Sequence, residues 1–82
     1  MPYTYIVRCA DDTLYTGCAV QLEKRVEAHN RGTGAKYTRG RGPVELVYWE
    51  CYETLGEAQS REAAIKKLTR REKMKLLSKP QE

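Results

Sequence analysis

The segment from Arg31 to Gly42 limits the fold most, because it separates two stretches of regular structure. It holds four of the six glycines in a chain of 82 residues. Glycine favours backbone conformations found outside helices and strands, so we predict a basic, flexible loop here. The remaining length has room for one modest core, and we expect a single domain over residues 1–78. Residues 79–82 are predicted to fray as a tail.

Two strands and a helix are predicted before the loop. Residues 3–9 and 13–17 are rich in β-branched and aromatic side chains, and a turn pattern at residues 10–12 joins them into a hairpin. From about Val20 the apolar residues repeat at helical spacing. This helix is predicted to end near Asn30, because Gly32 follows it.

A third strand and two helices are predicted after the loop. Both faces of residues 44–51 are largely apolar, so we expect this strand to be central and covered on both sides. The spacing of Thr54 with Glu57, and of Thr69 with Glu72, is that of capping boxes, which open two helices with a break near Leu68. The predicted fold class is a small α/β (α+β) domain, a three-stranded, mainly antiparallel sheet flanked by three helices.

The basic residues gather in two segments. The chain has a net charge of +4 and a pI of about 9.1, and its cations concentrate in residues 31–42 and 61–79. Such clusters favour a nucleic-acid partner, because phosphate neutralisation dominates that kind of affinity. An ordinary solvated surface is the alternative.

Patterns missing from the sequence bear on where the protein is located and on the redox state of its cysteines. The first residues do not have the pattern of a secretory signal, and no apolar run approaches the length of a bilayer span. We therefore expect a cytoplasmic protein without membrane association. Three cysteines without a CxxC pair favour reduced thiols, with Cys9 and Cys51 buried in strands. A zinc site formed by Cys9, Cys18, Cys51 and His29 is a weak alternative.

Glu62 occupies an unusual position in its predicted helix. At about 100° per residue it lies between Leu55, Ala58 and Ile65, within the stripe that the domain has to bury. Removing an ionised carboxylate from water costs several kcal/mol unless a positive group meets it. We therefore predict a cation beside Glu62, either an arginine or a metal ion.

Other polar side chains form a candidate site around this carboxylate. Tyr5 and Tyr15 lie on the two hairpin strands, and Arg25 and His29 share one helix face through their i, i+4 spacing. Two phenols, a guanidinium, an imidazole and a carboxylate are a plausible set for phosphoryl transfer. The alternatives are ordinary strand tyrosines, a helix-end imidazole, and an ion pair of Glu62 with Arg25 or Arg61.

The order of these residues resembles the GIY-YIG nuclease domain over almost the whole chain. Residues 34–40 and 61–69 are similar to those of the small stand-alone bacterial proteins of the YhbQ-like group. Tyr5 corresponds to the tyrosine of the first motif, with Tyr3 and Thr4 in place of glycine and isoleucine. Residues 15–17, with Tyr15 first, correspond to Tyr-Ile-Gly.

The helical residues continue the correspondence. Arg25 matches the helix arginine of the family, His29 the position of histidine or tyrosine, and Glu62 the metal-binding glutamate. The sequence departs from the pattern at three points. The first motif has no glycine, the region after Glu62 has no counterpart of the family's asparagine, and Cys18 stands where repair nucleases of the family have lysine.

The resemblance implies hydrolysis of DNA phosphodiesters assisted by one divalent ion, Mg²⁺ or Mn²⁺, held by Glu62. Oxygen ligands from one carboxylate and the substrate fit Mg²⁺. Arg25 would hold the scissile phosphate, and Tyr15 would orient or deprotonate the attacking water with Tyr5 as its partner. His29 is a candidate proton acceptor. The choice of general base among Tyr5, Tyr15 and His29 stays open.

Substrate contacts are expected in the glycine-rich loop. The residues Lys36, Tyr37, Arg39 and Arg41 would contact the nucleic-acid backbone, and Tyr37 could stack on a base. The resemblance implies a monomer with low sequence specificity, acting on branched, nicked or single-stranded DNA in repair or recombination, with RNA left open. One alternative is a nucleic-acid-binding module with weak or no catalysis. A weaker one is an interaction domain for an acidic protein.

Overall fold

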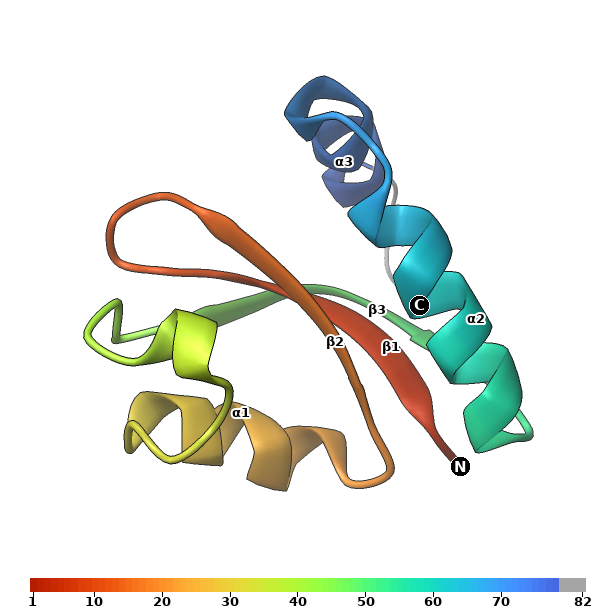
Figure 1. The fold of residues 1–82 in the computed structure, drawn as a ribbon, viewed down its shortest axis with the longest axis horizontal. Helices are drawn as coiled ribbons and strands as arrows, with labels where there is room; N and C mark the ends of the chain where they lie inside the picture. The colour runs from red at the N-terminus through yellow and green to blue at the C-terminus, as the bar shows by residue number, and fades with distance from the viewer. Residues whose placement is uncertain (79–82) are drawn as a thin grey trace.

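The computed structural model describes residues 1–78, which form an antiparallel sheet with three helices around it (Figure 1). The strands, in the spatial order β2-β1-β3, are β1 (Tyr3–Arg8), β2 (Leu14–Ala19) and β3 (Glu45–Cys51). The helices are α1 (Leu22–Asn30), α2 (Leu55–Lys66) and α3 (Arg70–Leu77), with a short 3-10 turn, η1 (Lys36–Thr38), in the glycine-rich segment. The predicted fold class is confirmed.

The prediction for the central strand is wrong. The middle strand is β1, which pairs antiparallel with β2 on one side and β3 on the other. Thr4, Tyr5, Ile6 and Val7 in β1 have no solvent exposure, whereas β3 lies at an edge. The apolar character of both faces of β3 arises because helices cover each face of the sheet, and this can happen at an edge as well as at the centre.

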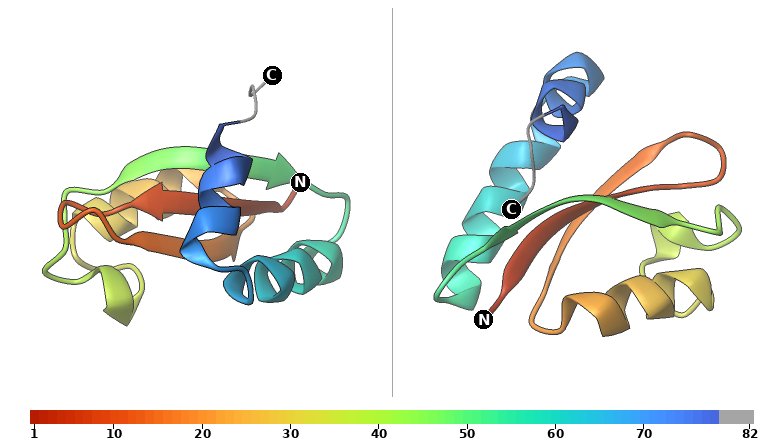
Figure 2. Two further views of the ribbon diagram at one scale, coloured as in Figure 1. Left: turned by 90° about the horizontal axis from the view of Figure 1, so that it is seen from above. Right: turned by 180° about the vertical axis from the view of Figure 1, so that it is seen from behind.

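The two faces of the sheet support two separate cores. Side chains alternate along β1, so Tyr5 and Val7 face α1 while Ile6 faces the other way. The α1 side also contains Leu22, Val26 and Trp49. On the other side, Ile65 of α2 and Leu76 and Leu77 of α3 pack around Ile6 and Tyr48. Figure 2 shows α1 and α2 on opposite sides of the strands. Both helices contact β2, and the candidate site lies along this strand.

The predicted helix boundaries are close to those observed. Thr54 and Thr69 each form a complete capping box, and the helix breaks between Lys66 and Arg70. Gly32 follows α1 with φ of +78°, as expected for a helix-ending glycine. Among residues 1–78, no helix combines the length and apolarity needed to cross a bilayer. The predicted tail at residues 79–82 lies outside the described residues.

Two burial predictions are corrected. Leu55 is 44% exposed, because it is the first residue of α2 and lies beyond the end of the core, although Ala58 and Ile65 in the same stripe are fully buried. Cys51 is exposed at the end of the edge strand, whereas Cys9 is buried as predicted.

Candidate active site

The hairpin register brings the two candidate tyrosines onto one face of the sheet. Tyr5 pairs with Gly17, and Val7 pairs with Tyr15, so the two phenols lie diagonally across the ladder. Tyr5 is fully buried and Tyr15 is half-buried. A Cβ atom at position 17 would lie 2.7 Å from Tyr5 Oη. Glycine is therefore required at this position so that the Tyr5 side chain can pass over β2.

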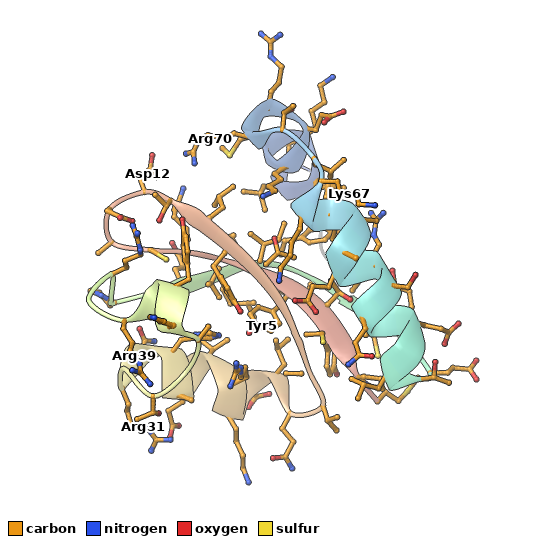
Figure 3. All side chains as sticks on the ribbon, viewed as in Figure 1. Tyr5, Asp12, Arg31, Arg39, Lys67 and Arg70 are labelled. Carbon is orange, nitrogen blue, oxygen red and sulfur yellow. The ribbon has the colours of Figure 1, made fainter. Side chains whose placement is uncertain are left out.

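The next side chains come from α1, whose inner face carries Arg25 and His29. The His29 ring is 1% exposed, and its Nε2 lies 2.7 Å from Tyr5 Oη. The rings of Tyr5 and Tyr15 approach the imidazole in edge-on geometry, with centroid distances of 5.9 and 5.3 Å. In Figure 3, Tyr5 lies at the middle of the molecule, between α1 and α2. The helix therefore presents its imidazole to both phenols.

The glycine-rich segment completes the surroundings of His29. The buried hydroxyl Oγ1 of Thr38, in η1, lies 2.8 Å from His29 Nδ1 and donates to the carbonyl of Ala35 at 2.9 Å. A Cβ atom on Gly34 would come within 2.4 Å of Nδ1. Sequence reasoning missed Gly34 and Thr38, because contacts between a loop and a helix leave no periodic pattern. The one sequence signal for these contacts is the glycine at position 34, which leaves space for the His29 ring.

These contacts assign the tautomer of His29. The single hydroxyl hydrogen of Thr38 goes to Ala35, so Oγ1 accepts from an N–H at Nδ1. The Ala35 amide also donates toward Nδ1, at 3.4 Å, which would favour a lone pair there, so we infer the assignment from the shorter contact with Thr38. Nε2 is then left with a lone pair that accepts from the Tyr5 hydroxyl. Burial and the nearby Arg25 charge lower the pKa of His29, which favours this neutral form.

The guanidinium of Arg25 lies beside the same phenols. Hydrogen bonding to Tyr5 is the main reason that the pKa of Arg25 is raised, and a weaker hydrogen bond to Tyr15 also contributes. Burial raises the pKa of Tyr5 to about 12 despite the opposing effect of Arg25, so Tyr5 stays protonated at neutral pH. Within residues 1–78, the buried Nε of Arg25 has no hydrogen-bond partner. Nε itself is covered, but Arg25 as a whole is only half-buried, so its permanent charge can attract an anion to this place.

Glu62 reaches the site from α2, on the other side of β2. Its side chain is only 19% exposed, and Lys66 Nζ lies 2.8 Å from its Oε2. The same Nζ lies 5.9 Å from the centre of the Tyr15 ring. Burial, followed by a hydrogen bond to Glu62, raises the pKa of the Cys18 thiol to about 11. Glu62 therefore interacts with Cys18 and Lys66, and Lys66 links it to Tyr15.

The ion-pair partner of Glu62 is neither Arg25 nor Arg61, the two arginines considered from the sequence. Lys66 forms the ion pair, whereas Arg61 binds Glu50 at 2.9 Å in a separate cluster with Tyr48 and Tyr52. The i, i+4 spacing of Glu62 and Lys66 is a sequence signal for this ion pair. A cation beside Glu62 was expected, and in the protein alone it is an ammonium group.

The donor set suits a magnesium ion better than zinc. Among residues 1–78, no three His, Cys, Asp or Glu side chains converge on a common metal position. The three cysteines and His29 therefore form no zinc site there. A single carboxylate such as Glu62 is a sufficient protein ligand for Mg²⁺, which keeps several waters and takes further oxygens from a substrate phosphate. The residues present are compatible with such an ion at Glu62.

The predicted contact residues of the loop have different surroundings. Tyr37 is 42% exposed and stacks on Tyr15 with a centroid distance of 5.6 Å. The Arg41 guanidinium lies 4.5 Å from the centre of the Tyr37 ring and pairs with Asp11. Tyr37 would have to leave one of these contacts to stack on a base. Lys36 and Arg39 are exposed on the same segment.

Comparison with known proteins matches residues 1–76 to the GIY-YIG catalytic domain. The chain belongs to the GIY-YIG family. A UPF0213 protein of Clostridium perfringens is 63% identical over 78 residues, which cover 95% of this chain and 84% of the relative. A UPF0213 protein of Staphylococcus aureus strain Mu3 is 56% identical, and the match covers 92% of each chain. These relatives place the chain with the small stand-alone GIY-YIG proteins of the YhbQ-like group.

Two solved structures share the fold. The solution NMR structure of a UPF0213 protein from Bacillus halodurans has a TM-score of 0.61 and 43% identity, with 95% of this chain and 84% of that one covered. The solution NMR structure of an E. faecalis protein has a TM-score of 0.60 and 45% identity, with 92% and 80% covered. GIY-YIG is a nuclease family that generally uses divalent metals, and a GIY-YIG domain implies a nucleic-acid substrate.

Proposed function

We propose that this chain is a divalent-metal-dependent endonuclease that hydrolyses DNA phosphodiesters with low sequence specificity. The observation that carries the proposal is the hydrogen bond between Tyr5 and His29, with Tyr15 and the Arg25 charge beside it and Glu62, paired with Lys66, across β2. It supplies an anion-binding donor, a phenol open to solvent, a neutral imidazole and a carboxylate in one place. Branched, nicked or single-stranded DNA, as met in repair and recombination, would be the substrate.

Arg25 is assigned to the scissile phosphate. Its charge is secured by the two phenols, and its buried Nε has no partner among the described residues. A fixed guanidinium in a partly dry site stabilises the negative charge that develops on a phosphate oxygen, at no cost in reorganisation. Because Arg25 already lies beside Tyr5 and Tyr15, its charge is in the site before the substrate arrives.

The two tyrosines take different parts. Tyr5 has no solvent exposure and a pKa of about 12, so it cannot contact a water molecule or serve as the base itself. Tyr15 is half-buried and is the phenol that can reach the attacking water. Tyr5 and His29 position Tyr15. The Nε2 lone pair of His29 accepts a hydrogen bond from the Tyr5 hydroxyl, and the imidazole packs edge-on against the Tyr15 ring. Tyr15 is therefore assigned to orient or deprotonate the water.

Glu62 is assigned as the protein ligand of the metal ion. A bound divalent ion would supply positive charge for the leaving oxygen and lower the pKa of bound water. Glu62 is held near Tyr15 by Lys66, an ion pair that is half exposed on the lysine side and therefore weak. Release of Lys66 would open the carboxylate to the ion at little cost.

The assignment is tested with Glu62→Gln, compared with Glu27→Gln. Both glutamates form an i, i+4 ion pair on a helix, Glu62 with Lys66 and Glu27 with Arg31. Cleavage of fluorescent duplex, nicked and single-stranded DNA is measured in Mg²⁺, Mn²⁺ or EDTA, with a parallel RNA arm. We expect metal-dependent product to vanish in Glu62→Gln and to persist in Glu27→Gln, with both variants folded.

The same assay defines the contrary results. Cleavage at the wild-type rate in Glu62→Gln would remove Glu62 from the mechanism. Wild-type protein that binds DNA but yields no metal-dependent product would instead be a nucleic-acid-binding module.

A further inference from the structure

The turn of the β1–β2 hairpin is held between cations from two distant segments. On one side, Arg41 of the glycine-rich loop pairs with Asp11 at 2.5 Å. On the other, Arg70 at the start of α3 pairs with Asp12 at 3.3 Å. Figure 3 shows Arg70 directed from α3 toward Asp12 at the hairpin turn. Both contacts join chain segments far apart in sequence, so cations border the hairpin on two sides.

On the side of the hairpin that faces α2 and α3, a second cation, Lys66, lies in the candidate active site. Its Nζ contacts Glu62 and lies near the Tyr15 ring. On the loop side, Arg41 lies over Tyr37, which stacks on the same Tyr15. Tyr15 is therefore bordered by a cation of α2 on one side and, through Tyr37, by a cation of the loop on the other.

The α2–α3 side carries a dense positive charge. Residues 66–75 contain six basic residues and one acid, a charge of +5, whereas the whole chain carries +4. The rest of the molecule is thus slightly negative in sum. Among the described residues, Lys67 and Arg71 form no ion pair. Such a concentration of cations next to a candidate nuclease site complements a polyanion.

We propose that Lys66 and Arg70 bind the backbone of double-stranded DNA, which lies along the hairpin between α3 and the loop of residues 36–41. The inference rests on the proposed function, because it takes nucleic acid as the substrate. The protein would then grip DNA on both sides of the phosphate held by Arg25. Contact on both sides favours cleavage within a strand, not removal of its terminal nucleotide.

In the free protein, acidic side chains occupy the positions that DNA phosphates would take. Asp12 is 73% exposed and Arg70 54% exposed, so water screens their pair and exchange for a phosphate costs little. Lys66 is 51% exposed in its pair with Glu62, so its ammonium group can likewise exchange the carboxylate for a phosphate without a metal ion. The eight residues of α3 span about 12 Å. This is the rise of roughly three nucleotides of one DNA strand, so the helix can lie beside about that many phosphates.

The test measures the salt dependence of binding to duplex DNA in EDTA, so that cleavage plays no part. Arg70→Gln is compared with Arg8→Gln, because Arg8 is also a partly exposed arginine paired with an acid, Glu45, at 3.1 Å. Removing one cation that neutralises a phosphate reduces the steepness of log affinity against log salt by about 0.9. We expect that reduction in Arg70→Gln, about twice that reduction when Lys66→Gln is added, and little change in Arg8→Gln.

Charge-conserving and acid-removing variants sharpen the result. Arg70→Lys and Lys66→Arg keep the charge, so each variant should keep the wild-type slope of log affinity against log salt. Asp12→Asn should tighten DNA binding more than Glu45→Gln does, because it releases a cation on the proposed surface. Circular dichroism and thermal unfolding check that each variant is folded.

Three results would overturn the proposal. The first is an equal slope in Arg70→Gln and Arg8→Gln, and the second is wild-type protein that does not bind duplex DNA. The third is wild-type protein that prefers poly-glutamate to DNA, which would indicate an acidic protein as the partner. The Mg²⁺ cleavage assay is scored separately, so a protein that grips DNA through α3 without cutting it would refute only the nuclease assignment.

Discussion

At the scale of single residues, the site depends on how one imidazole is held. His29 has a hydrogen-bond partner on each ring nitrogen, Tyr5 on Nε2 and Thr38 on Nδ1. A buried imidazole without a partner on Nδ1 could carry its proton on either nitrogen, and the Tyr5 hydroxyl would then lack its acceptor part of the time. Thr38 therefore positions the proton acceptor, although it contacts neither the phosphate nor the water.

Replacing Thr38 tests this role. Thr38→Val keeps the shape of the side chain but removes the acceptor for the Nδ1 proton. We expect a loss of about 1–3 kcal/mol in the free energy of unfolding, from the buried donor left unsatisfied. The ¹⁵N chemical shifts of the His29 ring should move from one dominant tautomer to a mixture. Thr38→Ser should keep both the tautomer and the activity, and an unchanged tautomer in Thr38→Val would show that the Thr38 hydroxyl does not set it.

At the scale of helices and strands, local chemistry predicted the element ends well and the strand order poorly. Both capping boxes exist as predicted, because the threonine and glutamate of each box lie three residues apart. The position of β3 was mispredicted, since a strand that is apolar on both faces can be central or covered at an edge. Strand order depends on which segments pair across the loop of residues 31–42, and no local pattern records that choice.

The second capping box sets the direction of α3. Thr69 Oγ1 accepts from the Glu72 amide at 3.2 Å, and Glu72 accepts from the Thr69 amide at 2.8 Å. Thr69→Ala should lower the free energy of unfolding by about 1 kcal/mol in urea denaturation. Ser60→Ala, an exposed change within α2, should have little effect or stabilise slightly, because alanine is the better helix former. Equal effects of the two changes would mean that α3 needs no cap.

At the scale of the whole molecule, stability should depend on pH through one buried side chain. His29 is the single histidine of the chain, and burial with the Arg25 charge lowers its pKa below the ordinary value of 6.5. The unfolded chain therefore binds more protons than the folded protein as pH falls through 6.5. Folding stability is greatest above that pH and is lost progressively toward the lower pKa of folded His29.

The variant His29→Gln isolates this effect. Glutamine offers an acceptor to Tyr5 and a donor to Thr38 but does not titrate. We expect wild-type thermal midpoints to fall between pH 7 and pH 5.5, where few other side chains titrate, while the midpoints of His29→Gln change much less over that range. Parallel curves for the two proteins would show that folding does not lower the pKa of His29.

Much of the candidate site could be predicted from the sequence, and the unpredicted part has a common physical cause. Tyr5, Tyr15, Arg25 and His29 lie close together, as the strand and helix periods in the sequence predict. Glu62 is linked to Tyr15 through Lys66 across β2. Their roles remain predictions until the variants are measured. Contacts made by irregular backbone, such as those that Gly34 and Thr38 make with His29, became visible only in three dimensions.

The glycine-rich segment has one consequence for anyone who alters this protein. It is anchored at His29 through Thr38, nine positions later, and at the Ala10 amide, which donates to the Arg41 carbonyl at 2.7 Å. A replacement loop has to keep the number of residues between these two anchors and a glycine at position 34. Otherwise the His29 imidazole loses its hydrogen bond to Thr38 or is displaced by a side chain at position 34. What reads as the most expendable stretch of the chain is therefore among the least suited to insertions, tags or shortening.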